Sequence, residues 1–354
     1  MNAVSVRAGD VTYEAHVGSG LLAEIGSLLR DVVRGPRCAL VADANTARLF
    51  AEPVTESLRA SGFEPTLIKV PAGEMAKSLS QAGRVCDEMT AAGLDRSSFV
   101  VAVGGGVIGD LAGFAAAIYH RGIPHVQVPT TLLAQVDSSI GGKTGVNTRA
   151  GKNLLGAVHQ PALVVADVET LRSLPRRELN QGFAEIIKHA IIRDPSLFDV
   201  LEHFDPDKFA ELVHRNIEIK AAVVARDEHD LSGERAILNF GHTVGHAIER
   251  ATGYDRFLHG EAVSLGIVAA CDISVRKAGF PPADRDKVIH ALTAFDLPTR
   301  LPDDVDRAAI ADAVAGDKKF EHGDVRFVVV EALGAARLAT DVTMRDITSA
   351  IAAL

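Results

Sequence analysis

Short apolar runs alternate with helix-like stretches over roughly the first 170 residues of the chain. The runs CALVAD, FEPTLIKV, SSFVVAVGGG and HVQVP are rich in β-branched residues, and segments of helical periodicity separate them. This is the βαβ rhythm of a parallel sheet. The opening segments VSVRAG and VTYEAHVG alternate apolar and polar residues instead, which predicts an antiparallel hairpin at the sheet edge. We therefore expect an α/β N-terminal domain with a mostly parallel, Rossmann-like sheet.

After Leu174 the pattern changes to long periodic stretches that are typical of helices. The clearest are RRELNQGFAEIIKHAIIRD, RAILNFGHTVGHAIERATG and HGEAVSLGIVAACDISVRKAG, and one strand-like run, VRFVVVEALG, lies near the C-terminus. A chain of 354 residues also exceeds the size at which a single core usually stops growing. The sequence predicts two domains, residues 1–172 and a mainly α-helical 173–354, with ligands bound between them beyond the carboxyl ends of the parallel strands.

Composition narrows the possible partners. The net charge of -9 argues against affinity for nucleic acid or anionic membranes, so an anionic ligand has to be held by local cations. No basic segment precedes an apolar run at the start, and no apolar stretch is long enough to span a bilayer, which predicts a cytoplasmic protein. Cys38, Cys86 and Cys271 lie far apart in apolar surroundings, so we expect buried thiols rather than disulfides.

A glycine-rich segment, GGGVIGD, follows one of the apolar runs. Gly104, Gly106 and Gly109 satisfy GxGxxG, which lets backbone amides approach a phosphate at a helix N-terminus. The segment is not in the first βα unit and no acidic residue follows at the usual distance, so the motif alone is weak evidence. Asp43 ends the run CALVAD, with Asn45 beyond it, and is explained equally well as a ribose ligand or as a helix N-cap.

The segment Pro129–Asn153 is rich in small and hydroxyl residues. It places Lys143 in a glycine-rich turn and ends with Lys152 and Asn153, a pattern that suits a phosphate or carboxylate site. The alternative is a flexible surface loop, although long loops without structure are usually functional.

Titratable residues cluster in the helical half. His242 and His246 are separated by one helical turn, and His259 follows with Gly and Glu behind it, which together with a carboxylate suits zinc. Arg235 and Asn239, with the same spacing, are placed to contact an anion and a hydroxyl beside that metal. The spacing of Glu185 and Lys188 favours a surface ion pair, although the surrounding run is apolar. Lys220, Lys318 and Lys319 have the pattern of ordinary surface lysines.

Several motifs, in order, closely resemble the 3-dehydroquinate synthases of the sugar phosphate cyclase superfamily. They are GGGVIGDLAGFAAAIYHRG, VPTTLLAQVDSSIGGKTGVN, GKNLLGA, AEIIK, RAILNFGHTVGHAIE, LHGEAV and DKKF, and they span about residues 40 to 335. The resemblance implies an NAD-containing domain joined to a metal-containing helical domain, with zinc or cobalt as the metal. It also implies a homodimer.

The implied reaction converts 3-deoxy-D-arabino-heptulosonate 7-phosphate to 3-dehydroquinate and phosphate in the shikimate pathway. Its steps are transient oxidation by NAD, β-elimination of phosphate, re-reduction, ring opening and aldol cyclisation. NAD is regenerated in each turnover, so no net redox change occurs.

The resemblance also assigns residues. The metal ligands would be Glu185, His242 and His259. NAD would be contacted by Asp43, Asn45, Glu74, Lys77, Gly105, Gly106, Val107, Asp110, Thr130, Thr131, Lys152, Ser173 and Leu174. Substrate would be held by Arg121, Asp137, Lys143, Asn153, Lys188, Lys220, Arg235, Asn239, Lys318 and Lys319, with His246 as proton relay.

Within that set, Lys143, Asn153 and Lys188 would bind the phosphate, and Arg235 and Lys220 the carboxylate and ring hydroxyls. The stretch ARDEHDLSGER is one residue longer than in typical family members. Asp230 is the best match for the family's acidic proton acceptor.

Three alternatives remain open at the level of sequence. A sister cyclase, of the 2-epi-5-epi-valiolone or 2-deoxy-scyllo-inosose type, would change residues around Asn239 and His246, both of which are retained here. A metal-dependent dehydrogenase of the glycerol dehydrogenase type needs no phosphate-binding lysines at the GGKT and AEIIK positions. A catalytically inactive scaffold would bind neither NAD nor metal.

Overall fold

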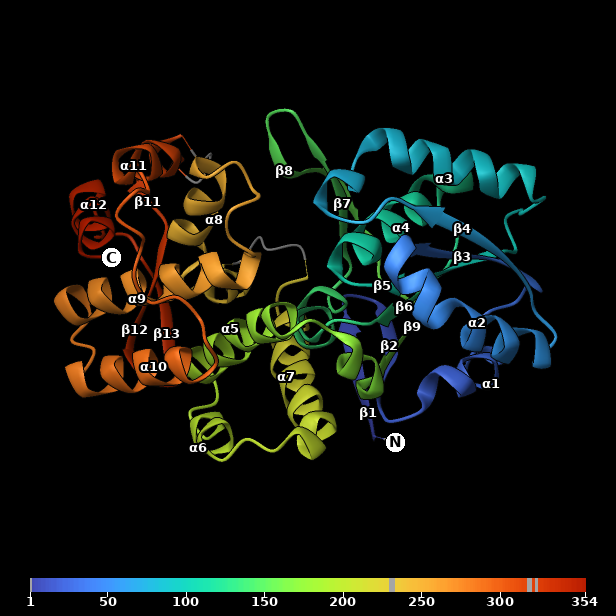
Figure 1. Cartoon of the computed structure of the whole chain (residues 1–354), viewed down its shortest axis with the longest axis horizontal. Helices are drawn as coiled ribbons and strands as arrows, with labels where there is room; N and C mark the ends of the chain where they lie inside the picture. The colour runs from blue at the N-terminus through green and yellow to red at the C-terminus, as the bar shows by residue number, and fades with distance from the viewer. Residues whose placement is uncertain (1, 229–232, 317–319, 322–323) are drawn as a thin grey trace. The chain divides into compact units, whose positions relative to one another are not determined.

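The computed structural model describes residues 2–228, 233–316, 320–321 and 324–354 (Figure 1). Contacts divide the chain into two compact units, Met1–Leu174 with Asp207–His229, and Pro175–Pro206 with Asp230–Leu354. Helix α7 (Phe209–Val224) therefore belongs to the first unit, where it packs on strand β1 (Asn2–Ala8). The division expected at residue 172 put this helix in the second domain, because a single boundary cannot represent a segment that returns to the first unit.

The first unit is built on a seven-stranded sheet in the order β1-β2-β9-β6-β5-β3-β4. Strand β1 pairs antiparallel with β2 (Val11–Gly18), which confirms the edge hairpin. The other pairings in this sheet are parallel, as the apolar runs predicted. They involve β3 (Arg37–Asp43), β4 (Glu64–Val70), β5 (Phe99–Gly104), β6 (His125–Pro129) and β9 (Leu163–Asp167). The sequence analysis missed β9, although its run LVVAD has the same β-branched character.

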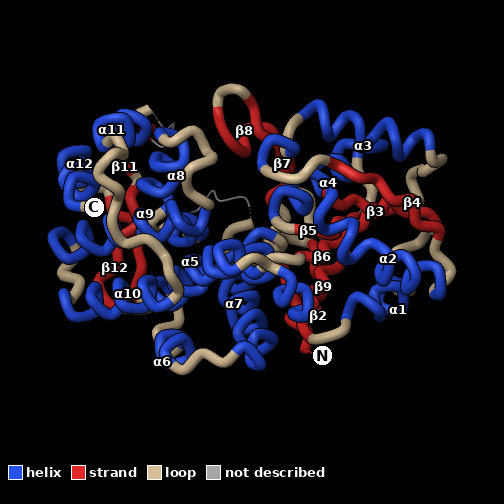
Figure 2. The backbone as a smooth tube through the Cα atoms, viewed as in Figure 1, coloured by secondary structure: helices blue, strands red, loops and turns tan. Residues whose placement is uncertain are grey.

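Helices cover both faces of this sheet (Figure 2). Leu40 and Ala42 share one core with helices α1 (Ile25–Leu29) and α2 (Ala44–Ala60). Ala39 and Val41 point the other way, into a core with α3 (Leu79–Ala91) and α4 (Gly106–Ile118). The alternation follows from the two-residue period of a strand. Because both faces are buried, the strands are continuous apolar runs, as parallel strands usually are.

The strand order creates a topological switch point between neighbouring strands β3 and β5. From β3 the chain passes through α2, on one face, to β4; from β5 it passes through α4, on the other face, to β6 in the opposite direction. Open α/β sheets bind ligands in the crevice outside the carboxyl ends of such strands. The fold therefore places a ligand site beside Asp43 and Gly104.

The segment expected to be a long loop is structured. After β6 comes a π-helical turn, η4 (Ala134–Ser138), and then an antiparallel hairpin of β7 (Lys143–Thr148) and β8 (Gly151–Val158). The hairpin register shifts between Val146 and Thr148, where Asn147 alone stands opposite residues 152–154, so the bulge lies on β8. The surface-loop alternative is wrong, because the small residues of this segment serve close packing of the hairpin.

The second unit is mainly helical. Helix α9 (His259–Lys277) contacts α5, α8, α10, α12 and strand β12. The elements of this unit are α5 (Arg176–Ile192), α6 (Leu197–Glu202), the 3-10 turn η7 (Arg235–Asn239), α8 (His242–Ala251), α10 (Pro282–Ala294), α11 (Arg307–Ala315), β10 (Phe320–Glu321), β11 (Asp324–Val325), β12 (Phe327–Ala332), β13 (Ala335–Ala339) and α12 (Met344–Ala353). Among the described residues, no helix has both the length and the apolarity needed to cross a bilayer.

One predicted helix of this unit is wrong in its extent. The stretch RAILNFGHTVGHAIERATG is not continuous: η7 ends at Asn239 and α8 begins at His242. Gly241 between them has φ 79, a left-handed conformation that ends one helical segment and re-aims the next. Periodicity spans the break because apolar residues continue on both sides of it.

Candidate functional site

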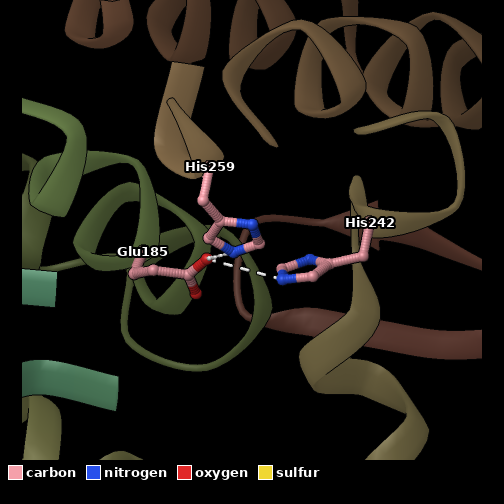
Figure 3. A group of neighbouring side chains, drawn as sticks. All are labelled: Glu185, His242 and His259. Atoms are coloured by element: carbon pink, nitrogen blue, oxygen red, sulfur yellow. Dashed lines mark ion pairs between the residues drawn. The ribbon is translucent and has the colours of Figure 1, made fainter. Parts of the chain in front are cut away.

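Three side chains of the second unit converge from three different helices (Figure 3). Glu185 comes from α5, His242 from the start of α8 and His259 from the start of α9. The Oε1 atom of Glu185 lies 3.5 Å from Nε2 of His242 and 3.6 Å from Nε2 of His259. One atom from each residue lies within 4.8 Å of the others, so the group can hold a metal ion.

The spacing of these atoms suits tetrahedral zinc or cobalt. Ligand atoms about 2.0–2.1 Å from a tetrahedral metal are about 3.4 Å apart, close to the two distances between Glu185 and the histidines. Both carboxylate oxygens of Glu185 are buried without a well-formed hydrogen bond. Lys188 pairs with Oε2 of this carboxylate, whereas Oε1 faces the two histidines and is the oxygen placed to bind a metal. Three protein ligands leave a fourth position open, which is typical of catalytic rather than structural sites.

Outer contacts orient both histidines. Nδ1 of His242 lies 3.1 Å from the carbonyl oxygen of Phe240, so the ring can donate there and direct the Nε2 lone pair toward Glu185. Nδ1 of His259 lies 3.4 Å from Oε2 of Glu249, which is 2% exposed. Glu249 thus stands behind His259 as carboxylates commonly do behind metal-binding histidines. The sequence analysis missed Glu249, although it ends the motif HTVGHAIE.

A second group, His246, Glu249 and His259, also has atoms within coordinating distance. It would require Nδ1 of His259 and the solvent-exposed His246. The group with Glu185 is the better metal site, because Glu185 and His242 are buried and Glu249 remains available to orient His259.

The charges of this cluster are perturbed in different directions. Burial opposes ionisation of Glu185, but Lys188 and the two histidines outweigh it and hold the pKa well below its usual value. Burial lowers the pKa of His242 to about 4, which leaves this ring neutral and able to bind a metal. Burial also disfavours charge on His259, yet Glu185 and Glu249 raise its pKa to about 10. A metal bound at His259 would therefore displace a proton.

Close helix packing brings the ligands together. A Cβ atom on Gly260 would lie 2.0 Å from the carbonyl oxygen of Gln181, so α9 approaches α5 at a distance that only glycine permits. Glu261, the last residue of the HGE motif, is not a ligand. Its Oε2 accepts from the Leu258 amide at 2.8 Å, and its carboxylate pairs with Arg177 at 2.6 Å. The motif thus combines a ligand, a packing glycine and a helix cap.

The expectation of a surface ion pair between Glu185 and Lys188 is wrong. The two side chains are paired, but Glu185 is 0% exposed and Lys188 only 1%. The i, i+3 spacing predicted the contact, whereas burial depends on the helices packed around α5, which spacing does not show. A buried pair of this kind is expensive and favours a functional role.

Other predicted residues of the second unit have varied positions. Arg235 is buried and Asn239 half-buried in η7, and because a 3-10 turn has three residues per turn, their spacing does not align them as in an α-helix. His246 is exposed, with its ring centroid 5.9 Å from that of His259. Asp230, Lys318 and Lys319 lie outside the described residues.

In the first unit, the predicted NAD residues follow the carboxyl ends of neighbouring parallel strands. They follow β3 (Asp43, Asn45), β4 (Glu74, Lys77), β5 (Gly105, Gly106, Val107, Asp110), β6 (Thr130, Thr131) and β9 (Ser173, Leu174). The carboxyl ends of parallel strands share one edge, so these residues lie along that edge on both sides of the switch point. Lys152 joins them through Glu74, with 4.0 Å between Nζ and Oε1.

The turn at the start of α4 is suited to a pyrophosphate. Gly105 precedes the helix, and no side chain caps it. A Cβ atom on Gly105 would lie 3.0 Å from Cγ2 of Thr131, so glycine keeps this approach open. Amide groups at a helix N-terminus then face the ligand. Asp43 does cap α2, accepting from the Asn45 and Thr46 amides at 2.8 and 2.9 Å, which confirms the N-cap interpretation without testing the ribose contact.

A polar network surrounds Lys77, which is 6% exposed. Its Nζ lies 2.5 Å from Oδ2 of Asp110 and 2.5 Å from Oδ1 of Asn153. Burial raises the pKa of Asp110 above its usual value, although Lys77 opposes that shift. The network joins a predicted NAD contact to a predicted phosphate contact.

Asn147, which stands opposite the bulge on β8, also belongs to this network and was not identified from the sequence. Its Nδ2 donates to Oε1 of Glu74 at 2.6 Å, and its Oδ1 accepts from the Asn153 amide at 3.0 Å. Its strand, KTGVNT, has several other polar residues, so the amide does not stand out in the sequence, and no spacing rule links it to Glu74.

Lys220 and Asp137 form a second charged pair in this unit. Lys220 lies on α7 and is 6% exposed, and its Nζ is 2.7 Å from Oδ1 and 2.6 Å from the carbonyl oxygen of Asp137. Asp137 lies in η4, and π-helical turns are frequent at functional sites. Lys220 is therefore not the solvated lysine that its pattern suggested.

Two predicted substrate residues lie at the surface. Lys143 begins β7 and is exposed. Arg121 is also exposed, with φ 69, and lies between the end of α4 and the start of β6. It is thus at the amino edge of the sheet, and within this unit it is not brought together with the residues at the carboxyl edge.

Comparison with known proteins gives a consistent family. The 3-dehydroquinate synthase N-terminal model matches residues 67–181, and the 3-dehydroquinate synthase C-terminal model matches residues 182–320. The 3-dehydroquinate synthase of Symbiobacterium thermophilum is 49% identical over 345 residues, covering 95% of this chain and 96% of that protein.

Solved structures of sugar phosphate cyclases share the fold. A 2-deoxy-scyllo-inosose synthase complexed with carbaglucose-6-phosphate, NAD+ and Co2+ superposes with a TM-score of 0.90 at 25% identity, covering 99% of both chains. A 2-epi-5-epi-valiolone synthase from Streptomyces hygroscopicus subsp. jinggangensis 5008, with NAD+ and Zn2+ bound, gives 0.87 at 30% identity, covering 98% of both chains.

Proposed function

The chain belongs to the 3-dehydroquinate synthase family, and on that premise we propose the reaction that it catalyses. It converts 3-deoxy-D-arabino-heptulosonate 7-phosphate into 3-dehydroquinate and phosphate in the shikimate pathway, and so acts as a carbon–oxygen lyase. The observation that carries the proposal is the buried group of Glu185, His242 and His259, on a chain that also has a dinucleotide-type edge in its first unit.

NAD and a divalent metal, zinc or cobalt, serve as cofactors. When bound, they supply reversible hydride acceptance and Lewis acidity. The carboxyl edge of the sheet would hold NAD, with the Gly105 turn at the pyrophosphate and Asp43 at a ribose. Glu185 and the two histidines would hold the metal, and Glu249 would keep His259 in the tautomer that binds it.

The substrate is doubly anionic, so binding depends on local cations in an acidic chain. We assign the phosphate to Lys143, Asn153 and Lys188, and the carboxylate and hydroxyls to Arg235 and Lys220. Further contacts are proposed from Arg121, Asp137, Asn239, Lys318 and Lys319. Removal of phosphate leaves a negative charge on the leaving group, and fixed cations stabilise such charge without reorganisation.

His246 is proposed as the proton relay. Its ring is exposed on α8, one helical turn after His242, so it can exchange protons with solvent while it remains beside the metal ligands. An imidazole is suited to this task because its usual pKa is near neutrality. The role of Asp230 as a proton acceptor stays a prediction.

A sister cyclase activity is the second candidate, because the solved sister cyclases superpose closely. Sequence identity favours 3-dehydroquinate synthase, at 49% against 25% and 30%. A glycerol dehydrogenase-like activity is disfavoured by Lys188, since a buried cation beside the carboxylate ligand has no role in a reaction without phosphate.

We also propose that the chain forms a homodimer. Strand β8 carries exposed apolar residues, Leu154, Leu155 and Val158, and its fully exposed stretch is unusual for a lone protein surface. Light scattering of the wild type and of Leu154→Glu would test this. A wild type that is monomeric at micromolar concentration would contradict it.

The decisive experiment is phosphate release from 3-deoxy-D-arabino-heptulosonate 7-phosphate, with and without a chelator. Absorbance at 340 nm would be followed in parallel, and the product identified by mass and NMR. We expect chelator-sensitive release of phosphate, formation of dehydroquinate and no accumulation of NADH. Accumulating NADH without phosphate would indicate a dehydrogenase, and turnover only of sister substrates would indicate a sister cyclase.

A further inference from the structure

Asn147 stands where the hairpin meets the segment that follows β4. Its backbone amide donates to the carbonyl oxygen of Lys77 at 2.8 Å, and it forms an isolated parallel bridge with Ser78. It also lies at the irregular part of the hairpin, where three residues of β8 stand opposite this one residue of β7. Its side chain contacts both Glu74, which follows β4, and Asn153, on the bulged strand.

Both ends of that side chain are used. Nδ2 donates to Oε1 of Glu74 at 2.6 Å, while Oδ1 accepts from the backbone of Asn153 at 3.0 Å. Asn153 has φ 56, a left-handed conformation that asparagine adopts more readily than most residues with a side chain. The hydrogen bond from the backbone amide of Asn153 to Asn147 helps to hold that conformation.

The contacts close into a ring. Lys77 donates to Oδ1 of Asn153, Asn153 donates to Asn147, and Asn147 donates to Glu74 and, through its backbone, to Lys77. The carboxamide of Asn147 donates to Glu74 with its nitrogen and accepts from Asn153 with its oxygen, so both of its polar atoms are needed. An aspartate would place a second carboxylate against Glu74, and an alanine would leave both partners without their bond.

We propose that Asn147 is a positioning residue that couples NAD binding to phosphate binding within the first unit. The inference rests on the proposed function, which assigns Glu74 and Lys77 to NAD and Asn153 to the substrate phosphate. Because one amide fixes Glu74 and Asn153 together, a ligand that orders one partner also orders the other. By linkage, NAD raises the affinity for phosphate by the same factor as phosphate raises the affinity for NAD.

The test is calorimetric titration of NAD into the metal-loaded protein, with and without inorganic phosphate as the probe. In the wild type we expect phosphate to lower the Kd of NAD several-fold. In Asn147→Ala we expect the Kd of NAD to rise about 10-fold, and the effect of phosphate to disappear. In the same variant we expect the KM of the sugar phosphate to rise, and kcat to change by a smaller factor than KM, because Asn147 touches no reacting atom.

Two further variants separate positioning from general damage. Thr148→Val is the matched control, since its hydroxyl accepts from the Ala150 amide at 3.1 Å in the same hairpin but has no bond to Glu74 or Asn153. It should keep the wild-type coupling. Asn147→Asp is close to isosteric and should lose coupling through repulsion with Glu74. Adding Glu74→Gln to Asn147→Asp reverses donor and acceptor, and should restore part of the coupling.

The outcomes are distinct. Wild-type coupling in Asn147→Ala, equal loss in Thr148→Val, or a wild type whose NAD affinity ignores phosphate would overturn the proposal. If Asn147→Ala does not fold, Asn147→Asp with and without Glu74→Gln decides the question. A wild type that couples NAD to phosphate but releases none from the sugar phosphate would instead refute the proposed function.

Discussion

The two halves of the candidate site are built in opposite ways. In the second unit, three side chains from three helices converge on a buried point, and the central carboxylate of Glu185 has no well-formed hydrogen bond. In the first unit, the residues follow the ends of parallel strands, and Lys77, Asp110, Asn147 and Glu74 satisfy one another through hydrogen bonds. One half presents ligand atoms to a single point where a metal could bind, and the other is a network of hydrogen bonds along a sheet edge.

The difference predicts how each half responds to change. A converging site loses its function when any one ligand is removed, because the buried charges that remain are neither paired nor solvated. A network at a sheet edge loses affinity in steps, because backbone amides and neighbouring side chains still contact the ligand. The following predictions test that contrast.

Glu185→Gln should have the largest effect. Loss of the anionic ligand should release the metal on dialysis and reduce phosphate release by about 1000-fold or more, since metal catalysis supplies several kcal/mol. Metal content measured by plasma mass spectrometry, beside steady-state kinetics, checks this. Glu261→Gln is the control, because that carboxylate caps α9 and pairs with Arg177. Wild-type metal content in Glu185→Gln would refute the ligand set.

Glu249→Ala should weaken metal binding by about 10- to 100-fold without abolishing it, because Glu249 orients His259 rather than binding the metal. Competition with a chromogenic chelator measures the affinity. Glu249→Gln keeps an acceptor for His259 but loses the charge, so its effect should be smaller. Complete metal loss in Glu249→Ala, with retention in Glu185→Gln, would place the metal in the group that contains His246 instead.

Acid should destabilise the protein through a histidine that lacks the outer contacts of His242 and His259. His125 is 1% exposed, its ring stacks on His159 at 5.0 Å, and its Nδ1 has no partner among the described residues. Burial, and then His159, lower the pKa of His125 from 6.5 to about 3. The unfolded chain therefore binds a proton that the folded chain does not, and stability falls as pH drops from about 6.5 toward 3.

Between pH 7.5 and pH 5 this group should cost about 2 kcal/mol of unfolding free energy. Urea unfolding of the wild type and of His125→Leu gives the change in unfolding free energy between the two pH values for each protein. The difference between these two changes is the cost that His125 causes. Any effect that the substitution has at both pH values cancels in this comparison. Equal pH dependence in the two proteins would show that His125 is not the responsible group.

Asp43→Asn should have the smallest effect and separates the two roles of Asp43. Asparagine caps helices as well as aspartate does, so the unfolding free energy should change by less than about 0.5 kcal/mol. Loss of the carboxylate should raise the Kd of NAD about 10-fold if it contacts the ribose. Asp43→Ala should lower both stability and affinity. Unchanged NAD affinity in Asp43→Asn would leave Asp43 as a helix cap alone.

Sequence was sufficient wherever local pattern determines structure. Alternating and continuous apolar runs predicted the edge hairpin and the parallel strands, and helical periodicity predicted the second unit. Prediction from the sequence failed where tertiary contacts determine the structure. Gly241 breaks a helix that periodicity had joined, and the burial of Lys188 and Lys220 depends on helices from distant parts of the chain.

The candidate site shows the same limit. The metal group and the strand-end residues were found because they lie in motifs that resemble a known family. Asn147 and Glu249 end two of those motifs but were given no role, because each acts through a neighbour that is distant in sequence: Glu74 for the first and, across a break between two helices, His259 for the second. A residue that positions another has no spacing signature of its own.

The return of α7 to the first unit has a consequence for synthesis on the ribosome. Helices α5 and α6 of the second unit emerge from the exit tunnel before residues 207–229, which the first unit needs for its contacts with β1 and η4. When only the first 174 residues have been synthesised, the first unit cannot complete its packing, because α7 has not yet emerged. Until then, the surface that α7 covers is accessible to chaperones. A fragment that ends at residue 174 would lack Lys220, so Asp137 would lose the lysine with which it pairs.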